Sequence, residues 1–209
     1  MDKNSQKNGI IEGTIWKQLL IFFFPILVGT FFQQLYNTVD AVIVGQFAGK
    51  EALSSVGGSS SQIINFVVGF FTGLSAGATV IISQFYGAND ANKIHRALHT
   101  AYAFSIVGGI IAGIIGIALT VPVMKLMNTP EELMHDSAMY VMIYFGGLVF
   151  IFVYNMGSAI LRAIGDSKRP LYYLIICCFI NIVLDIVFVS VLKLGVLGVA
   201  VATFISQLV

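Results

Sequence analysis

Charged residues are scarce in this chain. Lys and Arg number 11 and Asp and Glu number 10 among 209 residues, whereas 57% of all residues are hydrophobic. An average soluble domain is about a quarter charged and under half apolar. The mean hydropathy of +0.91 therefore predicts an integral membrane protein. A net charge of +1 provides no clustered basic surface, so no nucleic-acid partner is expected.

Cysteine is also nearly absent. The two cysteines, Cys177 and Cys178, are adjacent within an apolar run. Neighbouring cysteines cannot close a useful long-range cross-link, and we interpret both as small packing residues.

Charge-free windows predict an all-α transmembrane lobe of six helices, since about 20 apolar residues cross a hydrocarbon layer of about 30 Å. The predicted helices cover roughly residues 17–47, 52–86, 93–120, 130–162, 170–192 and 196–209, after a cytoplasmic N-terminal segment 1–16. Residues 52–89 carry no charge and are long enough for two crossings. One crossing places eight Lys and Arg residues on the N-terminal side and three on the other. This bias predicts a cytoplasmic N-terminus.

Several local signals refine these helices. Thr129-Pro130-Glu131-Glu132 has the pattern of a capping box, and Pro170 is placed to open the next helix. Pro25 removes one backbone hydrogen bond within the first helix and predicts a kink or hinge. Glycines recur every four residues at Gly69, Gly73 and Gly77 and again at Gly109 and Gly113, a spacing that lets helices approach closely. The chain ends inside its sixth apolar run, so we expect this helix to be incomplete.

Apart from Glu131, Glu132 and Asp136 near the start of the helix 130–162, the only acidic residues within the predicted spans are Asp40 and Asp185. Gln33, Tyr36 and Asn37 share the helix face of Asp40, and Asn181 shares that of Asp185. An ionisable group inside an apolar span usually faces a cavity or the bundle interior and marks an ion or substrate path. At 1.5 Å per residue, Asp40, Asp185 and Thr203 all fall in the outer half of the membrane, where one polar pocket can collect them.

Two carboxylates, an amide and a hydroxyl are hard oxygen-rich ligands, suited to a proton or Na⁺ and not to a transition metal. Burial disfavours charged carboxylates, and a neighbouring acid makes joint ionisation harder. Two such acids can exchange protons or a cation between conformations, as an ion-coupled antiporter requires. The sequence does not distinguish H⁺ from Na⁺.

Other chemical motifs are incomplete. The stretch Gly45 to Glu51 resembles a P-loop but has one residue too few between its glycines and lacks the final Ser or Thr. His95 and His99 are four residues apart, but most zinc sites need three or four ligands, so no metal or other cofactor is expected. A membrane aspartyl protease would also use paired acids, but Val39-Asp40 and Leu184-Asp185 lack the Tyr-Asp and Gly-x-Gly-Asp settings of that class. We therefore expect no enzyme.

An ordered set of motifs resembles the multidrug and toxic compound extrusion (MATE) transporters. It comprises Pro25, Tyr36-Asn37-Thr38-Val39-Asp40, Gln84-Phe85-Tyr86-Gly87-Ala88, Leu161-Arg162-Ala163-Ile164-Gly165-Asp166, Asn181 with Asp185, and Gly198-Val199-Ala200-Val201-Ala202-Thr203. The resemblance covers essentially the whole chain and is closest to the prokaryotic branch with an acid on helix one and Asn-x-x-x-Asp on helix five.

The resemblance implies half of a twelve-helix transporter in the plasma membrane, which exports organic, mostly cationic compounds in exchange for H⁺ or Na⁺. It implies that Asp40, Asn181, Asp185 and Thr203 form the cation or proton site and that Pro25 is a bending point. Tyr36, Tyr140, Asn155 and Gln33 would line the pocket, although Asn155 lies by spacing closer to the cytoplasmic side.

The chain departs from the family pattern in its length, because 209 residues are enough for only one of the two lobes. The missing C-terminal lobe or a second copy of the chain is the expected partner, together with the bilayer and the drug. Two alternatives are a lipid-linked oligosaccharide flippase of the same superfamily and a non-transporting truncated remnant. Flippase cavities tend to be basic, whereas both intramembrane charges here are acidic.

Overall fold

The computed structural model describes residues 15–208, and every regular element among them is a helix. The expected N-terminal segment 1–16 lies outside the described residues, apart from its last two. In chain order the elements are α1 (Ile15–Ile43), η1 (Val44–Ala48), α2 (Gly49–Gly57), α3 (Ser59–Gly87), α4 (Ala91–Leu126), α5 (Glu131–Gly146), α6 (Leu148–Ala163), α7 (Lys168–Asp185), η2 (Ile186–Val191) and α8 (Gly195–Leu208). The elements η1 and η2 are short π-helices.

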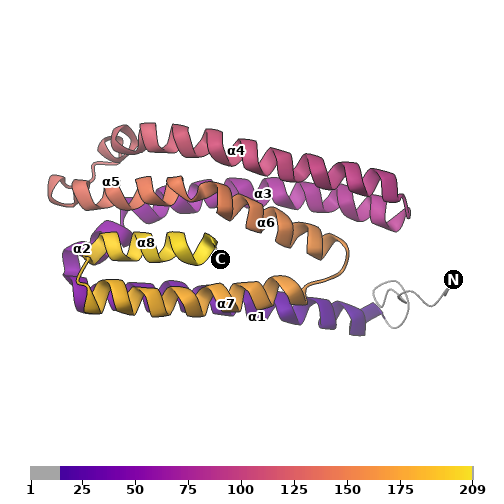
Figure 1. Ribbon diagram of the computed structural model, residues 1–209, viewed down its shortest axis with the longest axis horizontal. Coiled ribbons are helices and arrows are strands. Elements are labelled where there is room, and N and C mark those ends of the chain that lie inside the picture. The colour runs from indigo at the N-terminus through magenta and orange to yellow at the C-terminus, as the bar shows by residue number, and fades with distance from the viewer. Residues whose placement is uncertain (1–14, 209) are drawn as a thin grey trace.

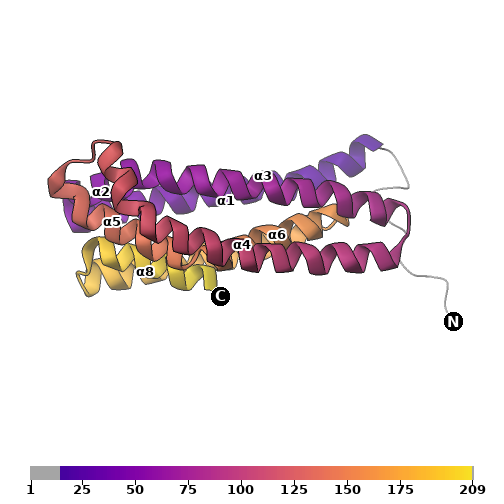
Figure 2. The same cartoon turned by 90° about the horizontal axis from the view of Figure 1, so that it is seen from above.

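The helices run side by side in an elongated bundle (Figures 1 and 2). α1 packs along α7, while α3 and α4 pack against α6. α8 lies between α5 and α7 and joins the two groups. The start of α1, the α3–α4 connection and the α6–α7 connection lie at one end of the bundle (Figure 1). We call this the basic end, because its helix termini carry Lys17, Lys93, Arg96, Arg162, Lys168 and Arg169.

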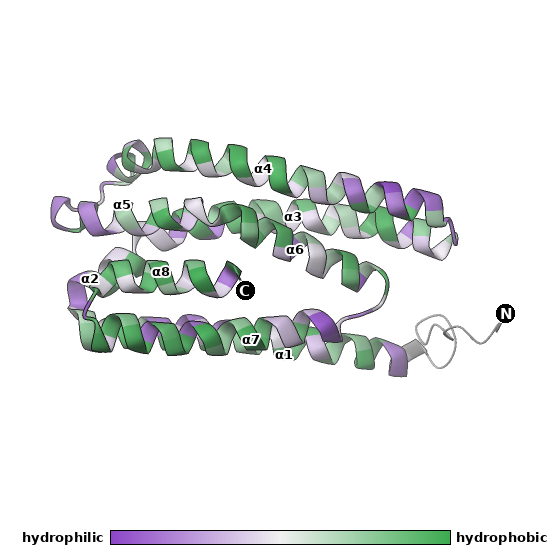
Figure 3. Ribbon diagram, in the orientation of Figure 1, coloured by the Kyte–Doolittle hydropathy of each residue, from purple (hydrophilic) through white to green (hydrophobic). Residues whose placement is uncertain are grey.

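Hydrophobic residues cover most of each helix, and hydrophilic ones concentrate near the two ends of the bundle (Figure 3). Four helical stretches in residues 15–208 are long and apolar enough to cross a membrane, or five if the bent pair α5–α6 counts as one span. α8 is a shorter apolar helix. Large side chains such as Phe66, which is 78% exposed, face outward, as a lipid-facing surface requires.

The expected helix 130–162 is two helices. α5 and α6 meet at a 51° bend, where Gly146 and Gly147 are adjacent. Glycine pairs are common at sharp kinks. A Cβ at Gly147 would lie 2.8 Å from the Phe204 ring of α8, so this glycine also permits the close approach of α8.

The expected break between the first two spans is present, and a short extra helix follows it. Gly49, with φ of 91° and ψ of 178°, interrupts the helix inside the predicted gap, and α2 then leads to a second break at Gly58. The α3 helix then starts at Ser59, seven residues later than the predicted 52. A Cβ at Gly58 would lie 2.7 Å from the Ser54 carbonyl oxygen, which explains why the turn uses glycine.

The residues that begin or cap several helices differ from those predicted. The capping box at Thr129 does not form, because the Thr129 hydroxyl donates to Ser59 Oγ at 2.9 Å and Pro130 has no capping side chain. α7 starts at Lys168 instead of Pro170, because Asp166 Oδ1 accepts from the backbone N–H groups of Lys168 and Arg169, both at 3.1 Å. Asp90 caps α4 through the Lys93 N–H, and these hydrogen bonds hold the pKa of Asp90 below its usual range.

Only one of the two glycine repeats makes a close helix contact. A Cβ at Gly109 would lie 2.8 Å from Val149 Cα, and one at Gly113 would lie 2.8 Å from the Phe145 carbonyl oxygen. The expectation of close packing at Gly69, Gly73 and Gly77 fails for the described residues, since nothing lies within 4 Å of a Cβ at any of them. Gly109 and Gly113 therefore set the α4–α5–α6 packing.

Candidate functional site

Two buried carboxyl groups from helices far apart in the sequence meet through one amide. With the Asn181 amide oriented so that its nitrogen donates, this nitrogen lies 2.8 Å from Asp40 Oδ1 and 3.2 Å from Asp185 Oδ2. Asn181 and Asp185 are fully buried, and Asp40 is 9% exposed. We call Asp40, Asn181 and Asp185 the acid cluster.

Helix packing explains how the acid cluster forms. Asn181 and Asp185 are four residues apart on α7 and therefore share one face. α1 lies along α7, where the Cys178 thiol approaches the Phe32 carbonyl oxygen at 3.9 Å. The packing brings Asp40 of α1 to the same level as this face.

A π-helix follows each acid. η1 begins at Val44, four residues after Asp40, and η2 begins at Ile186, directly after Asp185. The two π-helices contact each other, and both Val44 and Val189 are buried within them. Such π-turns are rare and frequently occur at functional sites. The sequence patterns gave no sign of them.

Other polar side chains surround the acid cluster. The Tyr36 hydroxyl lies near the Asp40 carboxyl and the Thr203 hydroxyl. Tyr140 is buried within electrostatic range of both acids. Asp185 Oδ1 and Thr203 Oγ1 are buried and make no hydrogen bond of good geometry within residues 15–208. Two oxygen ligands of the cluster thus retain free lone pairs.

This arrangement favours a cationic species. The ion pairs of the described residues, Lys93–Asp90 and Arg169–Asp166, lie at helix starts and not in the cluster. Two adjacent buried carboxylates repel each other and lose hydration, so a proton or a cation between them is favourable. Carboxylate and hydroxyl oxygens suit Na⁺ as well as H⁺.

Three of the predicted residues lie elsewhere. Pro25, Gln33 and Asn155 line a separate cavity of about 130 Å³ between α1, α6 and α7. The Asn155 amide donates to the Ile151 carbonyl oxygen of its own helix at 2.9 Å. This cavity also contains Arg162, which sequence reasoning did not include in a site although it lies in the quoted Leu161–Asp166 motif.

The two histidines lie outside both regions. His95 and His99 of α4 approach each other at 3.1 Å between their Nε2 atoms and are exposed. No group of three or more His, Cys, Asp or Glu residues with metal-binding geometry occurs within residues 15–208.

The profile of the MatE family matches residues 25–187, a range that contains both acids and the Asn181 bridge. The chain belongs to the MatE family. It is therefore a multi-pass membrane protein of the MATE transporters, as the sequence motifs predicted.

Individual MATE relatives agree with this assignment. The probable multidrug resistance protein YoeA of Bacillus subtilis (strain 168) is 32% identical over 93% of this chain and 43% of its own length. Structures of a MATE protein in straight and bent conformations match with TM-scores of 0.89 and 0.88, both at 26% identity. They cover 99% and 98% of this chain and 45% and 46% of theirs. The chain spans less than half the length of these MATE proteins.

Proposed function

We propose that this chain forms the N-terminal lobe of a secondary active antiporter that exports organic, mostly cationic compounds in exchange for H⁺ or Na⁺. The single observation that carries the proposal is the acid cluster, in which the Asn181 amide bridges Asp40 and Asp185 in the apolar bundle. The multidrug resistance name of a relative supports the choice of cargo.

The acid cluster provides the coupling step in this proposal. When the ion leaves, two carboxylates remain close together in a poorly hydrated site, which is electrostatically unfavourable. Binding of an organic cation or of the coupling ion relieves this repulsion, so the two species compete. Asp40, Asp185 and Thr203 are the proposed ion ligands, the Asn181 amide nitrogen holds the two carboxyl groups together, and Tyr36 and Tyr140 form the wall beside them.

The proposed transport pathway needs a second lobe. MATE relatives are more than twice as long as the matched region, so the partner is a C-terminal lobe or a second copy of this chain. The cargo then passes between two lobes, while the coupling ion binds within this one.

Substitution of each acid tests the proposal in a protein that carries both lobes. Asp40→Asn and Asp185→Asn keep the side-chain shape and remove one charge. Each is expected to reduce drug efflux by about tenfold or more, equivalent to about 1.4 kcal/mol or more of barrier. Efflux of ethidium from cells, with membrane insertion checked by quantitative blotting, measures this effect.

The matched control is Asp136→Asn, which makes the same change in α5 at a residue outside the acid cluster. Efflux is expected to stay within twofold of the unsubstituted protein. Normal efflux in both Asp40→Asn and Asp185→Asn would refute the coupling role of the cluster.

A further inference from the structure

The cavity between α1, α6 and α7 is polar and differs in charge from the acid cluster. It has a volume of about 130 Å³, and its wall includes Gln33, Tyr154, Asn155, Ser158, Arg162 and Ser167. Its charged lining residue is basic, whereas the acid cluster has two acids. The helix α1 therefore contributes residues both to the acid cluster and to a cavity whose charged residue is the basic Arg162.

Arg162 has no carboxylate partner among residues 15–208. The nearest candidate in sequence, Asp166, forms an ion pair with Arg169 at 3.0 Å. The same carboxyl group also accepts from the N–H groups that start α7. Arg162 is partly buried, and partial burial of an unpaired charge is costly. The carbonyls at the C-terminus of α6 compensate for only about 0.3–1 kcal/mol of such a cost.

The cavity wall offers hydrogen-bond donors to an anion, and no Asp or Glu is among its lining residues. A guanidinium presents five N–H groups in a planar fork that matches carboxylate and phosphate oxygens. The Ser167 side chain is 5% exposed and lines the cavity. The Tyr154 hydroxyl already donates to the Pro170 carbonyl oxygen at 3.4 Å. Arg162 with Ser167 is thus the donor pair available to a ligand.

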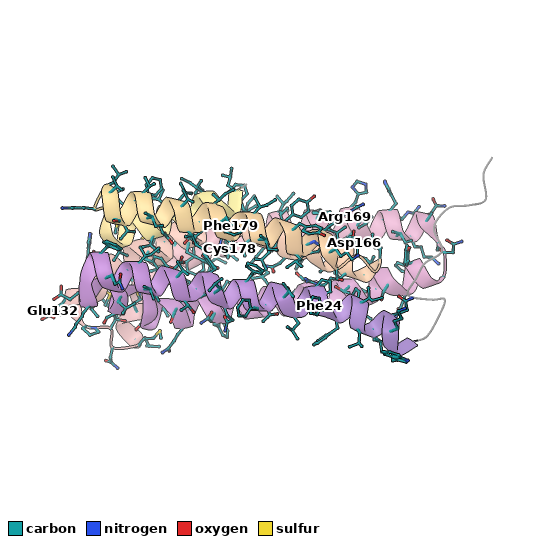
Figure 4. All side chains as sticks on the ribbon, turned by 90° about the horizontal axis from the view of Figure 1, so that it is seen from below. Phe24, Glu132, Asp166, Arg169, Cys178 and Phe179 are labelled. Atoms are coloured by element: carbon teal, nitrogen blue, oxygen red, sulfur yellow. The ribbon has the colours of Figure 1, made fainter. Side chains whose placement is uncertain are left out.

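The position of the cavity indicates where such a ligand comes from. Ser167 also lines an adjoining cavity of about 210 Å³ with Gln18, Phe22, Lys168 and Asp166, whose carboxyl group is already paired with Arg169. Figure 4 shows Asp166 and Arg169 near the start of α7, close to the part of α1 that carries Phe24. Both cavities lie toward the basic end of the bundle, the level at which lipid phosphates meet basic residues.

We propose that Arg162 and Ser167 bind a single phosphate group in this cavity, from either an anionic phospholipid or free inorganic phosphate. Arg162 makes the charge-assisted hydrogen bonds, and Ser167 donates one neutral hydrogen bond. Pro25 lies in the same cavity wall, so the bound phosphate lies beside the predicted hinge of α1. This site does not depend on the acid cluster or on transport.

A binding measurement on the full 209-residue chain in detergent tests the proposal. Native mass spectrometry counts bound molecules during titration with phosphatidylglycerol, with phosphatidylcholine and with inorganic phosphate. We expect one saturable ligand that Arg162→Gln weakens by about tenfold or more, because charge-assisted hydrogen bonds are lost. Arg162→Lys keeps the charge but loses the fork, and an intermediate affinity is expected.

The control is Arg169→Gln, which removes the same charge from a nearby exposed residue that is already paired with Asp166. Its effect is expected to stay within about twofold. Preferential binding of phosphatidylglycerol identifies a lipid ligand, whereas saturable binding of inorganic phosphate identifies the free anion.

Two outcomes would overturn the proposal. One is the absence of saturable binding of any of the three probes to the unsubstituted chain, a result that does not depend on how a variant folds. The other is an equal loss in Arg162→Gln and Arg169→Gln, which would mean that diffuse positive charge holds the ligand. Neither outcome would affect the acid cluster or its coupling role.

Discussion

At the scale of single residues, Asn181 joins the two acids. Its nitrogen contacts one oxygen of Asp40 and one of Asp185, so the amide offsets part of the cost of burying both carboxyls. Asp185 Oδ1 and Thr203 Oγ1 keep unused hydrogen-bonding capacity. Most buried polar atoms in proteins have partners, and these two exceptions lie among the residues proposed to bind the ion.

Replacement of Asn181 by Leu should destabilise the chain. The substitution removes two hydrogen bonds to carboxyl groups, and hydrogen bonds to charged groups contribute about 1.5–3 kcal/mol each. A clear fall in the thermal unfolding temperature in detergent at pH 7 is expected.

Asn155→Leu is the matched control for this measurement. The Asn155 amide donates only to a carbonyl of its own helix, so a smaller effect, below about 1 kcal/mol, is expected. Equal unfolding temperatures for Asn181→Leu and Asn155→Leu would mean that the amide bridge does not contribute to stability.

At the scale of elements, irregular helix geometry accompanies the polar residues. α1 contains Pro25, and both acid-bearing helices pass into π-helix just after their acids. The α5–α6 pair bends at adjacent glycines beside Phe204. Regular helices surround these irregular segments, so the bundle combines rigid packing with a few positions at which helices can bend.

Replacement of Pro25 by Ala tests whether this proline acts as a hinge in α1. Alanine restores the backbone N–H and removes a ring that costs about 3 kcal/mol or more inside a helix. The variant should insert normally and be at least as stable, while drug efflux by a two-lobe protein falls by roughly tenfold.

Pro122→Ala in α4 is the control, since it is a second proline inside a helix that lines neither the acid cluster nor the Arg162 cavity. Efflux is expected to remain near normal in this variant. Normal efflux in Pro25→Ala would show that transport does not need a proline hinge in α1.

The two glycine repeats give a separate prediction about packing. Gly109→Ala places a methyl group 2.8 Å from Val149 Cα, and overpacking of this kind costs about 1–3 kcal/mol. Gly73→Ala meets nothing within 4 Å and improves helix propensity by up to about 1 kcal/mol.

Thermal unfolding of both variants of the 209-residue chain measures the difference. The unfolding temperature should fall for Gly109→Ala and stay equal or rise for Gly73→Ala. The reverse order would show that the helix contacts at the two repeats are assigned incorrectly.

At the scale of the whole molecule, the chain corresponds to one part of a longer MATE protein. The chain matches solved MATE structures over nearly its full length but covers less than half of theirs. A complete ion site within the lobe and a transport pathway between lobes are therefore separate requirements.

An efflux assay separates these requirements. Cells that express the 209-residue chain alone are compared with cells that express the chain extended by a second MATE lobe, with ethidium as the substrate. Efflux is expected from the extended protein, because the pathway needs two lobes. Efflux from the short chain as well would show that two copies assemble, whereas its absence from both would contradict the proposed function.

The sequence by itself determined the class of protein and the participants of the acid cluster. Scarce charge and long apolar runs are local properties, and the cost of a buried charge singles out Asp40 and Asp185 without any coordinates. The spacing of Asn181 and Asp185 also follows from helix periodicity alone. These features therefore could be inferred before the fold was known.

Only the tertiary structure decided which of the other polar residues face the acids. Gln33 and Tyr36 are three residues apart on α1, yet Gln33 lines the Arg162 cavity and Tyr36 lies beside Asp40. The close approach at the Gly147 bend involves a side chain from a distant helix, Phe204 of α8. Spacing along one helix fixes which residues share a face, but the packing of neighbouring helices fixes what that face contacts.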